Sequence, residues 1–263
     1  MRPKITSRQN PLVKRFRAIA RGDEDDLLLL DGPHLIQDAL DAGLPLLHVL
    51  VSDDAVDRPD VRRLLDAAGA KGVDVAAASS MVMDAVSPVR SASVIVALAE
   101  PPPLRGDRMY ERPGLVIIAS DIQDPGNFGA IVRVAEAGGA TGVVAAGRSA
   151  HPFAWKALRG SMASALRLPI AVHRLTADAV DEARRHGCRI VATVPRGAAS
   201  HVDVDLRGPV AILIGGEGGG LPADLIDAAD VRVTIPMERP VDSLNAATAA
   251  AILVYEARRQ RAS

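Results

Sequence analysis

Short apolar runs alternate with helical patterns along the second half of this 263-residue chain. Each run is about five residues long and is bounded by polar or glycine-rich segments, as is typical of strands buried on both faces. Alternation of such strands with helices predicts an α/β fold with a mostly parallel sheet. The expected strands are 115–119, 142–146, 168–172, 189–194, 210–214 and 231–235, and the expected helices are 130–137, 149–165, 177–186 and one from about Ser243.

Residues 27–99 follow the same alternation and predict a smaller α/β unit of ordinary domain size. Ahead of this unit, Asn10 can cap a helix that has Pro11 in its first turn. Leu12, Phe16 and Ile19 recur at helical spacing and would form the apolar face of that helix. The strands expected in the unit are 27–30, 46–51, 73–76 and 93–98, and the expected helices are 33–42 and 61–70.

A proline-rich segment separates the two units. Residues 99–114 read AEPPPLRGDRMYERPG, and neither the helical nor the strand period continues through them. Three consecutive prolines cannot lie inside a helix or a central strand, so they indicate a short and fairly stiff connection. We therefore expect a first domain at 1–99, a linker at 100–113 and a second domain at 114–263.

Composition excludes several classes of protein. Apolar residues make up 48% of the chain and the mean hydropathy is +0.14, so a large core can be buried. No apolar run approaches the ~18 residues of a membrane span, and the basic N-terminus lacks the apolar core of a secretion signal. Cys188 is the single cysteine and the histidines are scattered, which excludes an internal disulfide and gives no metal-type spacing. We expect a cytoplasmic protein without a metal site and without membrane contact.

Positive charge is concentrated at the beginning of the chain. The formal net charge of the whole chain is -1, so a role with nucleic acid must depend on a local patch. Residues 1–22 contain seven basic residues and no acidic one, and among them are Arg8, Lys14, Arg15 and Arg17. Such a run is either the solvated face of a docking helix or an RNA-binding surface, and charge alone favours neither.

A glycine cluster follows the apolar run 210–214. Five of the six residues from 215 to 220 are glycine, and Glu217 is the exception. A tight turn needs only one or two glycines, whereas a loop that lets a ligand approach its backbone closely needs more. The cluster matches neither the dinucleotide motif G-x-G-x-x-G nor the P-loop motif. It predicts a small-molecule site that disfavours dinucleotides and triphosphates, and it leaves an adenosine-type ligand open.

The polar loop 121–129 also carries residues that packing does not require. Asn127 can either shape its own loop or face a ligand. Arg133 is the only charged residue in the apolar stretch 128–135. It is therefore either a surface residue or a buried one that needs a partner or a substrate.

A third loop connects the last expected strand with the last helix. It begins at Ile235 and Met237 and ends at Ser243, Leu244 and Asn245. Ser243 or Asn245 can serve as the cap of the helix, and either can instead line a site. Spacing alone favours the helix cap.

Taken together, the three loops resemble the three motifs of the SpoU (TrmH-type) RNA ribose 2'-O-methyltransferases of the SPOUT superfamily. The motifs are DPGNFG at 124–129 with Arg133, IGGEG at 214–218, and IPM at 235–237 followed by Ser243-Leu244-Asn245 and Tyr255-Glu256. Each motif alone is weak, but their order and spacing over residues 115–258 are specific. The opening segments SRQNPLVK at 7–14 and GPHLIQDAL at 32–40 are similar to members that methylate 23S ribosomal RNA.

The resemblance implies a fold that periodicity alone does not suggest. It implies a deep trefoil knot in the second domain, although knots are very rare among protein folds. It implies that the first domain is a small α/β RNA-binding domain like those of small ribosomal proteins. It also implies S-adenosyl-L-methionine as the cofactor, bent into the knot, and a homodimer in which Arg133 of one subunit can complete the site of the other.

The resemblance further implies roles for individual residues. The positions that match the family's cofactor contacts are Gly215, Gly216, Gly218, Ile235, Met237 and Leu244. The positions that match its catalytic residues are Asn127, Arg133, Glu217, Ser243 and Asn245. Arg8, Lys14, Arg15 and Arg17 then become expected RNA contacts. Three positions depart from the family pattern. Gly216 stands where asparagine or alanine is common, Asn245 is followed by AAT at 246–248 where VSV is usual, and RGSMASA at 159–165 lacks the glycine often found before its last alanine.

The implied function is transfer of a methyl group from S-adenosylmethionine to a ribose 2'-OH of RNA, with 23S rRNA as the expected substrate. Transfer RNA is the alternative substrate. A hypothesis from another class is a non-catalytic RNA-binding or ribosome-assembly protein that retains a degenerate knot. A nicotinamide-dependent oxidoreductase is disfavoured because its glycine motif is missing.

Overall fold

The computed structural model describes residues 3–24, 26–89, 91–104, 106–111 and 113–262. Arg2, which belongs to the basic N-terminal segment, lies outside them. The chain forms two compact units, one made of 1–102 with 153–159 and the other of 103–152 with 160–263. Among the described residues, no helix is both long enough and apolar enough to span a membrane.

The division between the units falls inside the proline-rich segment, between Pro102 and Pro103. The segment that follows is partly ordered. Gly106–Tyr110 forms a 3-10 helix, η1, and Met109 within it is fully buried in the core of the second unit. This division therefore lies within the run of prolines, and η1 is already part of the second unit.

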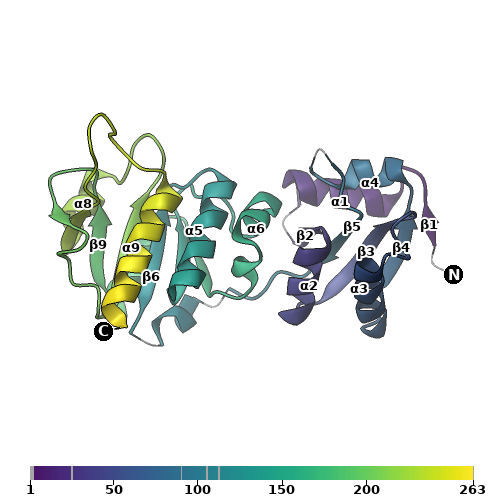
Figure 1. Cartoon of the computed structure of the whole chain (residues 1–263), viewed down its shortest axis with the longest axis horizontal. Helices are drawn as coiled ribbons and strands as arrows, with labels where there is room; N and C mark the ends of the chain where they lie inside the picture. Colours follow the sequence, from purple (N-terminus) through teal and green to yellow (C-terminus); the bar gives the residue numbers. More distant parts are fainter. Residues whose placement is uncertain (1–2, 25, 90, 105, 112, 263) are drawn as a thin grey trace. The chain divides into compact units, whose positions relative to one another are not determined.

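The first unit has a five-stranded mixed sheet with the order β1-β4-β3-β5-β2 (Figure 1). Strand β5 is antiparallel to β2 and to β3, and the other pairs are parallel. The strands are β1 Lys4–Ile5, β2 Leu28–Asp31, β3 Leu46–Ser52, β4 Asp74–Ala78 and β5 Ile95–Ala99, and the helices are α1 Pro11–Arg21, α2 Pro33–Asp41, α3 Pro59–Ala70 and α4 Ser80–Val86. The sequence does not predict β1 and α4, which are too short to show a period.

Helix α1 is a core helix with one charged side. The Asn10 side chain accepts a hydrogen bond from Leu12 N at 2.9 Å, which caps the helix as predicted. Val13, Phe16 and Ile19 are buried in a cluster with residues of α4 and the sheet, so Val13 takes the place expected for Leu12. Deleting the basic segment would therefore remove part of the core of the first unit.

The second unit has a seven-stranded sheet with the order β10-β12-β9-β11-β6-β7-β8, and its described strand pairs are all parallel. This confirms the predicted α/β class with a parallel sheet. The strands are β6 Leu115–Ser120, β7 Gly142–Ala146, β8 Ile170–His173, β9 Arg189–Thr193, β10 Ala199–Ser200, β11 Val210–Gly215 and β12 Val231–Thr234. The helices are α5 Pro125–Gly138, η2 Ser164–Leu166, α7 Thr176–Arg185, α8 Ala223–Ala228 and α9 Ala246–Arg261. Helix α6 Trp155–Ser161 crosses the division between the units, because 153–159 belong to the first one.

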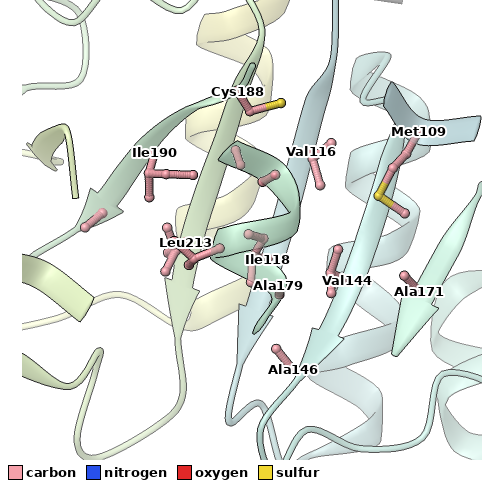
Figure 2. Close-up of a cluster of buried hydrophobic side chains, with 14 of the residues drawn as sticks. Met109, Val116, Ile118, Val144, Ala146, Ala171, Ala179, Cys188, Ile190 and Leu213 are labelled. Atoms are coloured by element: carbon pink, nitrogen blue, oxygen red, sulfur yellow. The ribbon is translucent and has the colours of Figure 1, made fainter. Parts of the chain in front are cut away.

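Helices cover both faces of this sheet. Helices α5 and α9 pack side by side on one face (Figure 1). On the other face, α7 packs over side chains of β6, β7, β9 and β11. Figure 2 shows this second core layer, in which Ile118, Val144 and Leu213 lie on the same face as Ala179 of α7. Cys188 belongs to the same layer, and burial raises the pKa of its thiol above the usual value.

Helix α5 begins earlier than the sequence prediction. It starts at Pro125, not at 130, because the Asp124 side chain accepts a hydrogen bond from Asn127 N at 2.7 Å and caps the helix. The sequence predicts a polar loop at 121–129, but proline is favoured in the first turn of a helix. Asn127 therefore lies on a helix and not in a polar loop.

Two other predicted helices are shorter in the structure. The helix expected at 149–165 is limited to α6, because Met162 and Ala163 adopt left-handed backbone angles, with φ of 46° and 63°. The last helix begins at Ala246 and not at Ser243. The short helix α8 and strand β10 were not predicted.

The C-terminal turn of α9 is anchored by polar contacts to distant segments of the second unit. The Arg261 guanidinium donates hydrogen bonds to the carbonyl oxygens of Pro113, Gly114, Leu206 and Gly208, at distances of 2.6 to 3.1 Å. One turn earlier Glu256 is buried, and hydrogen bonds from the Arg259 guanidinium hold the pKa of its carboxyl at about 2. These contacts attach α9 to the segments that precede β6 and β11.

Candidate active site

Four loops meet at one edge of the large sheet. Because β6, β9, β11 and β12 are parallel, their carboxyl ends lie at the same edge. The residues that follow these ends are the start of α5, the segment 193–195, the glycine cluster 215–220 and the segment 235–237. The loop that enters α9 joins them from the C-terminal side. This edge is where a parallel α/β sheet is expected to bind a ligand.

A cavity of about 570 Å³ lies between these loops. The cofactor contacts expected from the sequence all line it, namely Gly215, Gly216, Gly218, Ile235, Met237 and Leu244. Glu217, Ser243 and Asn245 also line it. Its size lies within the range of small-molecule sites, about 300–1,000 Å³.

The glycine cluster folds back on itself to form one wall of the cavity. Gly216 and Gly220 form an antiparallel bridge, in which Gly220 N donates to Gly216 O at 3.2 Å. A Cβ on Gly215 would lie 2.6 Å from Leu221 N, and a Cβ on Gly216 would overlap the carbonyl oxygen of Asp121. These two positions require glycine because of close backbone contact, so the loop is compact.

A continuous series of hydrogen bonds connects one residue from each of the three motifs. Asn127 Nδ2 donates to Glu217 Oε1, and Asn245 Nδ2 donates to Asn127 Oδ1 at 3.0 Å. Asn245 Oδ1 accepts from the backbone N–H groups of Ala247 and Thr248 and thereby caps α9. Asn245 is thus both a helix cap and a site residue. Ser243 is exposed and lines the cavity without capping the helix.

Arg133 is not brought to the cavity of its own chain. It lies on α5, six residues after Asn127, which places it about 240° around the helix axis. Arg133 is exposed, and it is not among the described residues that line the cavity. Of the two interpretations that the sequence left open, the structure supports a surface arginine.

The four basic residues that the sequence predicts to contact RNA differ in their contacts within the protein. Arg15 forms ion pairs with Asp26 at 2.8 Å and with Glu24 at 3.8 Å, and Arg8 Nε donates to the Met81 carbonyl at 3.2 Å. Neither Lys14 nor Arg17 has a hydrogen bond or an ion pair with the described residues. Lys14 is exposed and Arg17 is partly buried.

Sequence reasoning missed several residues that line the cavity. Among them are Thr193 at the end of β9, Val194 and Pro195 directly after it, and Leu221 and Ile226, which follow the glycine cluster. The signal for the first three was present, because the strand 189–194 was expected and the carboxyl ends of parallel strands form ligand sites. Nothing in the local sequence marks Leu221 and Ile226, whose role depends on the way the chain turns into α8.

The charge of the cavity limits the kind of ligand. Among the described residues that line it, the charged ones are Glu217 and Asp242, and both are acidic. Asp242 accepts a hydrogen bond from Arg196 Nη2 at 2.8 Å, which connects the β9–β10 loop with the loop before α9. A phosphate group would find no lysine or arginine on these described walls, whereas a ligand with a positive charge would be stabilised.

One group of possible metal ligands occurs in the described part of the chain, away from the cavity. A nitrogen of His186 and carboxylate oxygens of Asp107 and Glu182 lie within 4.8 Å of one another. Asp107 and His186 are exposed, and Glu182 Oε2 already contacts His173 Nε2 at 2.6 Å. Asp107 lies on η1, Glu182 on α7 and His186 directly after α7, and none of them lines the cavity.

Comparison with known proteins gives the same picture as the site geometry. The model of the SpoU rRNA Methylase family matches residues 114–255. An uncharacterized tRNA/rRNA methyltransferase of Synechocystis is 33% identical over 261 residues, which are 98% of this chain and 94% of the relative. The 23S rRNA (guanosine(2553)-2'-O)-methyltransferase RlmP of Bacillus subtilis is 28% identical over 257 residues, which are 97% of this chain and 98% of the relative.

A solved structure agrees over nearly the whole chain. The crystal structure of an AdoMet-bound rRNA methyltransferase from Sinorhizobium meliloti has a TM-score of 0.85 and 31% identity, and the match covers 97% of each chain. The family match covers all three motifs and the cavity between them. The chain therefore belongs to the SpoU rRNA methylase family.

Proposed function

We propose that this chain transfers a methyl group from S-adenosylmethionine to a ribose 2'-OH of RNA, most specifically of 23S rRNA. The observation that carries the proposal is the cavity at the sheet edge, with the hydrogen-bonded Glu217, Asn127 and Asn245 beside it. The B. subtilis relative is a 23S rRNA 2'-O-methyltransferase, which supports this substrate. Transfer RNA is the second candidate, because the Synechocystis relative is named for both RNAs. The proposed place of action is the cytoplasm.

The residues of the cavity fit this cofactor. Ile214, Ile235 and Leu253 provide apolar surface for an adenine ring, and the glycine cluster provides a wall of backbone groups. Glu217 and Asp242 favour a positively charged group such as a sulfonium. When it is bound, S-adenosylmethionine supplies a methyl group that is activated by the positive sulfur. The S. meliloti structure, which holds AdoMet, supports the same assignment.

The hydrogen-bonded residues can orient the acceptor ribose. Asn127 holds Glu217 through Oε1, so Oε2 of Glu217 is available to accept a hydrogen bond from the 2'-OH. The attacking oxygen must lie ~3 Å from the methyl carbon for reaction. Arginine stays protonated in proteins, so Arg133 is assigned as a clamp for a phosphate or for the developing oxyanion. Ser243 at the cavity wall is assigned to the ribose.

The proposal includes a homodimer and a knotted C-terminal segment. Arg133 on α5 and Tyr255 on α9 are exposed, and the two helices pack side by side, so a second copy could cover this face. Contact between identical faces about a two-fold axis could place Arg133 of each subunit at the site of the other. The knot is proposed for the segment that enters α9, since Leu244 lies in one cavity with the glycine cluster.

The first unit is proposed to bind RNA through the charged side of α1. Lys14→Ala in the full chain is expected to weaken RNA binding and to lower the slope of log K against log salt by ~0.7, the value for one phosphate contact with a single strand. Lys71→Ala is the matched control, because Lys71 is exposed at the end of α3. Binding measured by filter retention at several salt concentrations would show the difference. An unchanged slope for Lys14→Ala would refute its role.

Two measurements on the unmodified protein test the proposed function. Calorimetry with S-adenosylmethionine is expected to show binding, and labelled cofactor is expected to transfer its methyl group to rRNA from a strain that lacks this gene. Mapping of the 2'-O-methyl group would identify the nucleotide. If S-adenosylmethionine binds but no methyl group is transferred to rRNA or tRNA, the proposed methyltransferase activity is contradicted. If S-adenosylmethionine does not bind, the hypothesis of a non-catalytic RNA-binding protein is favoured.

A further inference from the structure

Two exposed arginines extend the edge of the sheet that carries the site. Arg174 directly follows β8, and Arg148 lies two residues after β7. The neighbouring strands β6, β7 and β8 are parallel, so the segments that follow them lie in a row at one edge. Asn127 follows β6 and adjoins the cavity. The row therefore leads from the acceptor side of the site past Arg148 to Arg174, with neighbouring strands ~4.8 Å apart.

The guanidinium groups of both arginines are accessible. The Arg148 side chain is 82% exposed, and its only hydrogen bond or ion pair with the described residues is from Nε to Asp121 Oδ1 at 3.5 Å. The terminal nitrogens of Arg148 are left for another partner. Arg174 is exposed and has no hydrogen bond or ion pair with the described residues. A guanidinium has five N–H donors and is well suited to bind phosphate.

Asp121 connects Arg148 with the cavity. Its backbone has a φ of 57°, a left-handed conformation that is costly for a residue other than glycine. Its carboxylate accepts a hydrogen bond from Arg148 N at 2.8 Å, and its carbonyl oxygen occupies the space beside Gly216. Asp121 thus contacts the cofactor wall with its backbone and Arg148 with its side chain. Local strain of this kind persists where the surrounding contacts require one conformation.

We propose that Arg148 and Arg174 bind backbone phosphates of the RNA strand that enters the site, and that Asp121 positions Arg148 beside the acceptor nucleotide. This rests on the proposed function, because it takes RNA as the substrate of the same site. Phosphate contacts fix the register of a nucleic acid without reading its sequence. The catalytic domain then contributes its own RNA contacts in addition to those of the first unit.

The test uses single substitutions in the full chain and steady-state methyl transfer. Arg148→Ala and Arg174→Ala are each expected to raise KM for RNA about three- to tenfold and to lower the salt slope by ~0.7. The kcat at saturating RNA and the affinity for S-adenosylmethionine are expected to stay unchanged. Arg207→Ala is the matched control, because Arg207 is exposed and precedes β11 at the opposite edge of the sheet.

The positioning role of Asp121 has a separate readout. Asp121→Gly retains the carbonyl next to Gly216 and adopts the left-handed backbone without strain, so it removes only the carboxylate. It is expected to raise KM for RNA as Arg148→Ala does. In the double variant the two effects should not add, because both act through the same phosphate contact. Additive effects would overturn the positioning role.

The outcomes separate this inference from the proposed function. If the unmodified protein transfers no methyl group to RNA, the proposed function fails, and this inference fails with it. If the unmodified protein is active and both arginine variants keep their KM and their salt slope, only the phosphate contacts are refuted. If the variants lose kcat instead of KM, the arginines act in the chemical step and the inference is also overturned.

Discussion

Arg133→Ala is expected to reduce methyl transfer by ~100-fold or more, since removal of one donor to a developing oxyanion has an effect of that size. Binding of S-adenosylmethionine should persist, because Arg133 does not line the cavity in the described part of the same chain. Single-turnover transfer from labelled cofactor and calorimetry measure the two quantities separately. The control Arg207→Ala should retain full activity. Substantial remaining turnover in Arg133→Ala would refute the assigned role.

A mixture of two inactive variants tests whether Arg133 acts across a dimer. Asn127→Ala lacks a residue of its own site but still supplies Arg133 to a partner. When equal amounts of Asn127→Ala and Arg133→Ala exchange subunits at random, half of the dimers contain one subunit of each variant. Each of these mixed dimers has one complete site out of two, so about one quarter of all sites are complete. Recovery to about that level is expected after subunit exchange. Without any recovery, Arg133 would have to act within its own chain.

Gly216→Ala is expected to lower the affinity for S-adenosylmethionine about tenfold or more. A Cβ at this position would overlap the carbonyl oxygen of Asp121, so either the glycine cluster or the end of β6 must move. Overpacking of this kind costs about 1–3 kcal/mol of stability. Alanine is common at this position in the family. In this chain the loss of affinity is expected nevertheless, because the carbonyl oxygen of Asp121 occupies the space that the Cβ would need. Calorimetry and thermal unfolding measure the two losses.

The neighbouring Gly219 provides a matched control for this substitution. A Cβ on Gly219 would have no atom within 4 Å, and its backbone is not left-handed. Gly219→Ala is therefore expected to leave the melting temperature unchanged. If the two variants behave alike, close contact with Asp121 is not the reason for glycine at 216.

The strands of the large sheet could be predicted from sequence because their residues are almost all buried. The runs 115–119, 142–146 and 210–214 lie within β6, β7 and β11. The pairing order could not be predicted, since β11 lies between β9 and β6, and β6 is far from it in sequence. Strand order depends on contacts between distant segments, and no local period records them.

The site could be predicted in part for a similar reason. Gly215 and Leu244 could be assigned because a resemblance of whole motifs placed them in one site, and the cavity does bring them together. The bonds from Asn127 to Glu217 and Asn245 depend on the packing of three distant loops. Arg133 lies outside the cavity because it is about 240° around α5 from Asn127, an angle that the polar loop predicted at 121–129 could not give.

The attachment of α9 has a consequence for the time at which the site becomes complete during synthesis. Leu244 and Asn245 form part of the cavity, and the helix that follows them is held by Arg261. A nascent chain that has emerged only as far as β12 has the glycine cluster but not this wall. Cofactor binding is therefore expected only after Arg261 has left the ribosome, so a prematurely terminated chain would not retain S-adenosylmethionine.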